Sequence, residues 1–302
     1  MPQKGIWGSN PQLSARNGEV AELVEGGGLE NRFAAQAVTG VRIPTSPPDT
    51  MNIELENINN ARDLGGMQAA DGQKIKPKRL IRSSALCDAS ESDINTLVKD
   101  YKLSHVVDFR TEAERCEKPH LLDKFIGVKY SFLESFDKIE EVVTRDKESN
   151  YMLIKKVDKL TEEAAIDIIE DFYDQLPTVA SLQIAYKMFF KILLENKDGA
   201  VLWHCSLGKD RAGIAAVLIE HVLGVSKEDI YKDYMLTNEN LDQSITKNKN
   251  NAFRVFYGVR ESFLDAWYQS VEDHYGNVDN YLNKKLGVGK KEIIKLRAMY
   301  LE

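Results

Sequence analysis

A short polar loop between an apolar strand and an apolar helix constrains this sequence more than any other feature. Ala200–Trp203 predicts a buried strand and Ile214–Leu223 predicts an apolar helix. Between them, the residues from His204 to Gly213 read His-Cys-Ser-Leu-Gly-Lys-Asp-Arg-Ala-Gly. A strand that leads through a tight loop into a helix is typical of α/β folds, whose ligand sites lie at the carboxyl ends of the strands.

The first half of the chain predicts the same architecture. Leu80–Ile81 is a short apolar strand, Ser90-x-x-Asp93 is a capping box that begins a helix, and residues 105–110 form a second strand. This order of strand, helix and strand implies a right-handed crossover and a parallel sheet. We therefore predict an α/β fold with a central, mostly parallel sheet flanked by helices.

Other local signals predict where elements begin and end. Residues 59–66 are a polar turn segment, and residues 70–72 (Ala-Asp-Gly) predict a hairpin-like turn. Thr161 caps one helix, and a second helix follows Pro177 and stops at Gly199. Ser226-x-x-Asp229 is a further capping box, and the C-terminal helices cover the sheet.

The domain organisation follows from where the sequence becomes regular. Residues 1–50 contain a Gly-Gly-Gly run, several prolines and few aromatic residues, so we expect poor order there. They are either a natural N-terminal extension or an added leader, with the native start at Met51. Residues 51–302 then form a single domain, with a helical or irregular, lid-like insertion at about 133–178.

Composition limits the class of function. The 302 residues carry a net charge of -7, which argues against a nucleic-acid partner. The three cysteines, Cys87, Cys116 and Cys205, are odd in number and widely spaced, so they predict neither a disulfide framework nor a metal cluster. No apolar stretch reaches the roughly 18 residues that span a bilayer. We expect no metal, no cofactor and no transmembrane segment. We expect a cytoplasmic location, with secretion by a signal-less route left open.

The loop between strand and helix has the chemistry of an anion site. Its successive N–H groups can converge as an anion nest, and the following helix adds the positive end of its dipole. Arg211 can clamp two phosphate oxygens, and Cys205 in such a positive cup ionises more readily. A buried cysteine is more often structural, and Cys-x5-Arg alone has little specificity. Gly208-Lys209 lacks the spacing of a nucleotide-binding Walker loop.

The run from His204 to Gly213 resembles the signature loop of protein tyrosine phosphatases. Its Lys-Asp variant is similar to the atypical bacterial members, which include tyrosine/serine and dual-specificity enzymes. Three further segments match that group: Asn60–Gly66 with the residues to Ser83 behind it, Val107-Asp108-Phe109-Arg110-Thr111-x-x-Glu114, and the region of Tyr275 to Leu282. The resemblance implies a phosphatase-type fold from about Asn59 to the C-terminus.

The resemblance also implies residue roles. Cys205 would be the nucleophile that forms a phosphocysteine intermediate, and phosphate would be bound by the loop residues Ser206, Leu207, Gly208, Lys209, Asp210 and Arg211. Asp210 is the preferred general acid. Asp108 is the alternative acid, or else forms an ion pair that supports the loop. Arg110 is expected to be structural, and Arg62 and Asp63 are expected to pair with each other near the loop.

One position departs from the family pattern. The residue after the signature arginine is usually Ser or Thr, whose hydroxyl helps the thiolate leave, and here it is Ala212. We therefore expect slow breakdown of the intermediate and a burst of product.

Three functions remain open on the sequence. The first is hydrolysis of phosphotyrosine, and of phosphoserine or phosphothreonine, in proteins. The second is hydrolysis of phosphoinositides, which Lys209 and a lid would favour. The third is a weakly active phosphate-binding module, which Ala212 makes conceivable.

Overall fold

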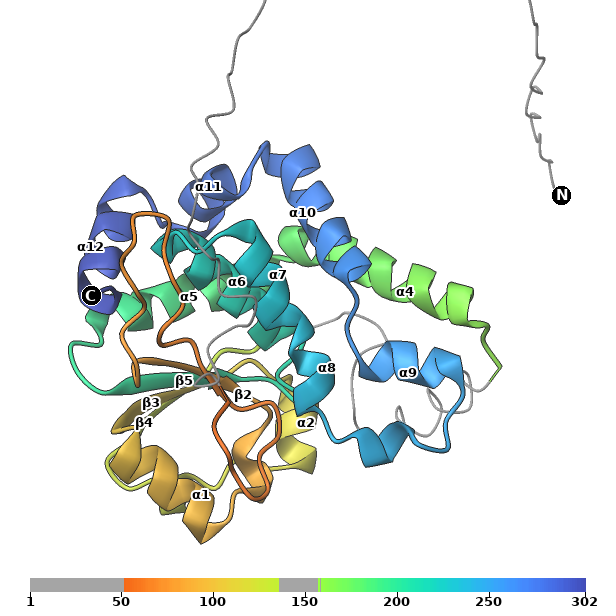
Figure 1. The fold of residues 1–302 in the computed structure, drawn as a ribbon, viewed down its shortest axis with the longest axis horizontal. Coiled ribbons are helices and arrows are strands. Elements are labelled where there is room, and N and C mark those ends of the chain that lie inside the picture. The colour runs from red at the N-terminus through yellow and green to blue at the C-terminus, as the bar shows by residue number, and fades with distance from the viewer. Residues whose placement is uncertain (1–51, 136–156, 158) are drawn as a thin grey trace, which may run out of the picture. The chain divides into compact units, whose positions relative to one another are not determined.

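A five-stranded sheet in the order β1–β2–β5–β3–β4 organises the residues that the structure describes (Figure 1). The structure is a computed structural model and describes residues 52–135, 157 and 159–302. The expectation for residues 1–50, and that for residues 136–156 and 158 of the insertion, lies outside the described residues and stays a prediction. The strands are β1 (Arg62–Asp63), β2 (Leu80–Ser83), β3 (Leu103–Asp108), β4 (Lys129–Phe132) and β5 (Ala200–His204).

The strand pairing confirms the predicted α/β class. Strands β2, β5, β3 and β4 are parallel, and only the edge strand β1 is antiparallel to its neighbour among the described strands. β5 inserts between β2 and β3, so the two strands of the predicted crossover are parallel but not adjacent. Residues 59–66 were expected to be a turn segment, and this is wrong at Arg62–Asp63. These two residues pair in register with Ile81 and Arg82 of β2.

The described helices and short helical turns cover both faces of the sheet. Those of the N-terminal half are η1 (Leu86–Asp88), α1 (Glu91–Asn95), η2 (Thr96–Asp100), α2 (Glu112–Glu117) and η3 (Leu122–Lys124). The central ones are α4 (Glu162–Gln175), η4 (Leu176–Thr178), α5 (Ala180–Glu195), α6 (Arg211–Leu223), α7 (Lys227–Met235) and α8 (Thr237–Asn240). The last are η5 (Gln243–Thr246), α9 (Asn251–Tyr257), α10 (Glu261–Tyr275), α11 (Val278–Tyr281), η6 (Leu282–Leu286) and α12 (Lys290–Tyr300).

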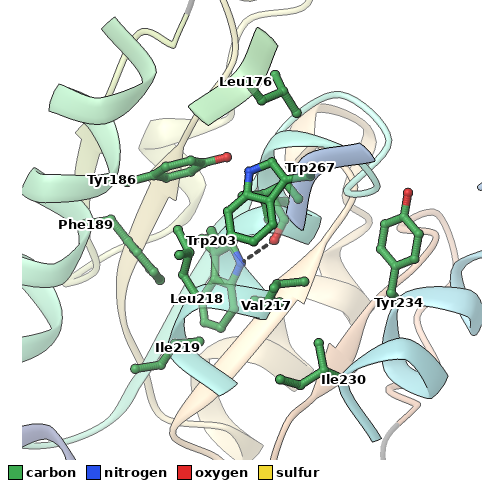
Figure 2. Close-up of a cluster of buried hydrophobic side chains, with 14 of the residues drawn as sticks. Leu176, Tyr186, Phe189, Trp203, Val217, Leu218, Ile219, Ile230, Tyr234 and Trp267 are labelled. Atoms are coloured by element: carbon green, nitrogen blue, oxygen red, sulfur yellow. Dashed lines mark hydrogen bonds between the residues drawn. The ribbon is translucent and has the colours of Figure 1, made fainter. Parts of the chain in front are cut away.

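Alternation along the central strand divides the core into two clusters. Val201 and Trp203 of β5 face the larger cluster, which the helices α4, α5, α6, α10 and α12 complete. Ala200 and Leu202 face the smaller cluster on the side of α1. This is the period-two pattern of a strand that is buried on both faces. Figure 2 shows the larger cluster, in which the Trp203 indole N–H donates to the Ala212 carbonyl at 3.0 Å.

Helix ends test the predicted capping signals. The capping box at Ser90 and the Thr161 cap of α4 are confirmed. Ser226 caps α7. The Asp229 carboxylate accepts from the Ser226 hydroxyl and not from the Ser226 backbone N–H, so the second hydrogen bond of a capping box is missing. The stop at Gly199 is wrong. Helix α5 ends at Glu195, and Gly199 takes a φ of 73° in the turn into β5.

No helix among the described residues is long and apolar enough to cross a membrane.

Candidate active site

The loop that follows β5 lies at the carboxyl edge of the sheet. Ser83 of β2 and Asp108 of β3 stand in register with His204, so all three strands end together there. Helix α6 begins at Arg211, three residues earlier than the expected Ile214. The loop therefore has the helix N-terminus directly behind it, which is the arrangement that favours a bound anion.

Cys205 begins the loop and is only 1% exposed. The neighbouring imidazole of His204 is fully buried, and its Nδ1 lies 3.0 Å from the Cys205 carbonyl oxygen. Burial lowers the pKa of His204, and this effect outweighs the opposing charge of Asp108. A neutral His204 therefore orients the start of the loop as a hydrogen-bonding group.

Arg211 is held by a carboxylate from another element. Its Nη1 and Nη2 donate to the two oxygens of Glu114 at 2.7 and 2.8 Å, in a fork-to-fork geometry. Nη1 also donates to the Phe109 carbonyl at 3.2 Å. Burial by itself would lower the pKa of Arg211, but the charge of Glu114 outweighs it and raises that pKa. The guanidinium is therefore permanently charged and fixed in orientation.

Glu114 also reaches the loop itself. It is N3 of α2, where it forms a capping box with Thr111. Its Oε1 accepts from the Ser206 hydroxyl at 2.5 Å. One carboxylate thus joins the helix cap, the second loop residue and the arginine. Sequence reasoning assigned no role to Glu114, although the Thr111-x-x-Glu114 spacing is the recognisable signal of a capping box.

Asp210 lies at the end of a chain of hydroxyl groups. The Tyr173 hydroxyl donates to Asp210 Oδ1 at 2.8 Å, and the Tyr234 hydroxyl donates to the Tyr173 oxygen at 2.8 Å. The Asp210 side chain is 14% exposed, and the Lys209 ammonium lies 3.3 Å from its Oδ1. No sequence signal pointed to the two tyrosines, because both reach the loop from distant helices.

Lys209 points to the end of helix α9. Its ammonium donates to the carbonyls of Phe256 and Gly258 at 2.9 and 3.1 Å. The side chain is 3% exposed. Lys209 therefore ties the loop to α9.

Asp108 forms an ion pair with Arg110. Arg110 Nη2 donates to Asp108 Oδ2 at 2.7 Å, and the Tyr130 hydroxyl donates to the same oxygen at 2.9 Å. Burial would raise the pKa of Asp108, but the positive charges and hydrogen bonds around it hold that pKa well below its ordinary value. Of the two roles considered for Asp108, this geometry favours the ion pair that supports the loop.

The expected pairing of Arg62 with Asp63 is wrong. Arg62 pairs with Asp233 of α7 at 2.9 Å, whereas Asp63 accepts backbone N–H groups of Gly65 and Lys78. The reason is geometric, because adjacent residues of β1 point to opposite faces of the sheet.

Within the described residues, no group of three His, Cys, Asp or Glu side chains could hold a metal ion. The loop instead brings the Cys205 thiol and the Arg211 guanidinium together with the carboxylates of Asp210 and Glu114.

Comparisons with known proteins show the family of this chain. The family model described as the tyrosine phosphatase family matches residues 53–302. A Cupriavidus necator protein, provisionally named as a tyrosine-protein phosphatase, is 28% identical over 264 residues, which are 83% of this chain and 88% of that one. The triple specificity protein phosphatase PtpB of Mycobacterium tuberculosis is 24% identical over 282 residues, covering 82% of this chain and 98% of PtpB. A tyrosine-protein phosphatase of Nostoc commune is 26% identical over 212 residues, 64% of each chain.

The family match spans all of the sheet, the loop at its carboxyl edge and the helices that hold the loop. It includes Cys205 and Arg211. The chain therefore belongs to the tyrosine phosphatase family and is a cysteine-dependent tyrosine phosphatase.

Proposed function

We propose that Cys205 is the nucleophile and that Arg211 binds the phosphoryl oxygens throughout the reaction. The observation that supports this most directly is the Glu114 clamp, which fixes the Arg211 guanidinium beside the loop that begins with Cys205. A rigid guanidinium can stabilise the charge on the transferred phosphoryl group without reorganising.

The reaction has two displacements on phosphorus. In the first, the Cys205 thiolate forms an S–P bond, the phenolic O–P bond breaks, and Asp210 gives its proton to the leaving phenolate. In the second, Asp210 takes a proton from water, the new O–P bond forms, and the S–P bond breaks to release inorganic phosphate and the thiolate. Both steps conserve charge and protons without a metal or a cofactor.

Asp210 is our choice of general acid over Asp108. Asp108 is fully buried and bound by Arg110 and Tyr130, so it is held as a carboxylate that has no proton to give. Asp210 is partly exposed and lies inside the loop, next to Arg211. This difference in exposure supports different tasks for the two carboxylates.

We propose a phosphorylated protein as the substrate, with phosphotyrosine as the preferred residue. We include phosphoserine and phosphothreonine as further substrates, and the relative named as a triple specificity protein phosphatase supports a specificity wider than one kind of residue. A phosphoinositide is the alternative substrate. The hydrogen bonds from Lys209 to two carbonyls disfavour it, because they engage the ammonium that would bind a second phosphate.

The first experiment separates an enzyme from a binding module. Vanadate-sensitive hydrolysis of an aryl phosphate is expected for the wild type, and Cys205→Ser should abolish it. Cys116→Ser is the matched control, because Cys116 is exposed, and it should keep full activity. Full activity of Cys205→Ser would exclude the covalent mechanism. A panel of phosphopeptides and phosphoinositides then identifies the substrate class.

The second experiment tests the acid. Asp210→Asn should slow hydrolysis of phenyl phosphate about 100-fold, the size of a general-acid contribution. It should slow hydrolysis of p-nitrophenyl phosphate far less, because that phenol leaves without a proton. Equal losses on both substrates would argue against Asp210 as the acid.

The three cysteines are all free thiols, which supports a reducing compartment such as the cytoplasm. Fractionation of cells that make the full chain would test this location.

A further inference from the structure

The carbonyl groups of the phosphate loop are the starting point. An anion nest works only if successive N–H groups point inward, and the carbonyls of the same peptides must then point outward. A carbonyl that turned inward would face the bound phosphate with its negative end. An outward carbonyl in a buried place needs a donor, because a buried acceptor without a hydrogen bond destabilises the fold.

Three consecutive carbonyls of the loop each receive a donor from the N-terminal part of the domain. The Ala85 N–H donates to Ser206 O at 3.1 Å, and Asn60 Nδ2 donates to Leu207 O at 3.0 Å. Arg82 Nη2 donates to Gly208 O at 2.8 Å. Each donor fixes the outward direction of one peptide in the loop.

A buried cluster holds two of these donors in place. Asp233 of α7 accepts from Arg82 Nη1 at 2.7 Å and from Arg62 Nε at 2.9 Å. Arg62 Nη1 in turn donates to Asn60 Oδ1. The Asn60 amide therefore connects Arg62 on one side to the loop on the other. All four side chains are buried, so their geometry is fixed by packing as well as by hydrogen bonds.

Gly208 of the loop and Gly213 of α6 both fit closely against this support. Gly208 has a φ of 71°, and a Cβ there would lie 2.3 Å from the Ser83 carbonyl oxygen. A Cβ on Gly213 would lie 3.0 Å from Arg82 Nη2. The glycines let the loop and the first turn of α6 approach β2 and the Arg82 guanidinium.

We propose that Asn60 and Arg82 are positioning residues for phosphate binding, which act by holding the carbonyls of Leu207 and Gly208 outward. The segment that begins with Asn60 is then part of the phosphate site, although it is about 150 residues from the loop in sequence. This inference rests on the proposed role of the loop in holding the phosphoryl group.

The net charge of this buried cluster also favours phosphate binding in the loop. Burial, and then the negative charge of Asp233, raise the pKa of the neighbouring Glu220 well above its ordinary value, so Glu220 is uncharged. Burial would also raise the pKa of Asp233, but the two arginines outweigh this and keep it ionised. Two guanidinium groups and one carboxylate leave an excess positive charge behind the loop, which favours an anion in it.

Asn60 allows a clean experiment. Its φ is 56°, a value that glycine and aspartate tolerate. Asn60→Gly removes the amide without backbone strain. Asn60→Asp keeps an oxygen for Arg62 but replaces the donor to Leu207 O with an acceptor. Lys102→Gly is the matched control, because Lys102 has a similar positive φ of 49° but is an exposed residue.

We expect both Asn60 variants to raise the inhibition constant of vanadate about tenfold, the weight of one lost hydrogen bond. The kcat/KM for an aryl phosphate should fall at least as much, while Lys102→Gly stays within about twofold. Asn60→Gly should still unfold cooperatively, but at a lower temperature than Lys102→Gly, because the buried Leu207 carbonyl loses its donor. Vanadate affinity that is unchanged in both Asn60 variants would overturn the inference.

Two further results complete the test. If neither Asn60 variant unfolds cooperatively, the vanadate affinity of Arg82→Lys tests the inference instead. A lysine ammonium cannot reproduce both contacts of the Arg82 guanidinium, which are with Asp233 Oδ2 and Gly208 O. If vanadate fails to inhibit the wild type and Cys205→Ser stays active, the proposed function itself fails. If instead vanadate inhibits the wild type and both Asn60 variants equally, only the inference about Asn60 fails.

Discussion

Glu114 of α2 and Arg211 of α6 are joined by two parallel hydrogen bonds of 2.7 and 2.8 Å, although 97 residues separate them in sequence. Glu114 is in turn fixed by its capping box with Thr111. The position of the arginine in the loop therefore depends on a short helix that follows a different strand. A bidentate pair sets an angle as well as a distance, and that angle decides where a phosphoryl group can lie.

Glu114→Gln tests this dependence. The amide nitrogen would meet one Arg211 donor with another donor, so the guanidinium should rotate. We expect kcat/KM to fall about 100-fold, as for a misplacement of about 1 Å at a reacting centre. Glu112→Gln is the control, because Glu112 makes a similar pair with Arg115 on the same helix but in solvent, and such pairs contribute little. Equal effects in the two variants would contradict the role of the clamp.

The same pair predicts how stability depends on pH. Burial would raise the pKa of Glu114, but Arg211 outweighs it and lowers that pKa from 4.5 to about 2. A depressed pKa stabilises the fold above the unfolded value, and this contribution is lost as the pH falls from 4.5 towards 2. It is on the order of 3 kcal/mol.

The measurement is the difference in the free energy of unfolding between wild type and Glu114→Gln. We expect this difference to be largest near pH 6 and to narrow steadily below pH 4.5, since glutamine does not titrate. A difference that stays constant down to pH 3 would mean that Glu114 is not held ionised by Arg211.

Local signals predicted much of the fold. Ser90 and Thr161 begin helices as their capping patterns indicated, and the apolar run of β5 precedes the loop as expected. The wrong helix stop at Gly199 shows the limit of such signals. The same glycine also fits the turn into β5, where a Cβ would lie 2.5 Å from the Lys102 carbonyl oxygen.

The loop itself could be recognised because its residues are consecutive. Its supports could not, because Asn60, Glu114, Tyr173 and Asp233 come from four distant segments that only the tertiary fold brings together. The order of the strands also depends on the tertiary fold. The place of β5 between β2 and β3 is set by long-range pairing, which no local pattern of β5 records.

Gly208→Ala tests how closely the loop must approach β2. Alanine at a φ of 71° would place its Cβ 2.3 Å from the Ser83 carbonyl oxygen, so the loop must move away. We expect kcat/KM to fall about 100-fold or more. Gly72→Ala is the control for backbone strain, because Gly72 has a φ of 85° with open space around its Cβ. It should cost about 1 kcal/mol of stability and leave activity unchanged. Active Gly208→Ala enzyme would refute the close approach.

Tyr173→Phe tests the hydrogen bond to Asp210. Burial keeps the pKa of Tyr173 well above its ordinary value, so its hydroxyl remains a donor. Loss of this donor frees the Asp210 side chain to rotate. We expect kcat for phenyl phosphate to fall about tenfold, with a much smaller effect on p-nitrophenyl phosphate. Tyr300→Phe, which removes a buried hydroxyl bound to Leu193 O, should not distinguish the two substrates. If it does, the effect is one of stability and not of Asp210.

Ala212 predicts the rate-limiting step. It is fully buried in the first turn of α6, directly after Arg211, and it supplies no hydroxyl to stabilise the departing thiolate. Formation of the phosphocysteine should therefore be faster than its hydrolysis. Rapid mixing with an aryl phosphate should show a burst of phenol that is close to one per enzyme, followed by a slower steady rate.

Ala212→Ser should shrink this burst and raise the steady rate about tenfold, because a hydrogen bond to a charged group contributes about 1.5–3 kcal/mol. Ala215→Ser is the matched control, since it adds a hydroxyl to another fully buried alanine of α6, three residues further along the helix. It should lower stability and leave the burst unchanged. Since the hydroxyl would act on sulfur as a leaving group, the rate of the burst itself should change little in Ala212→Ser. A wild type without a burst, or a burst that Ala212→Ser leaves intact, would place the slow step elsewhere.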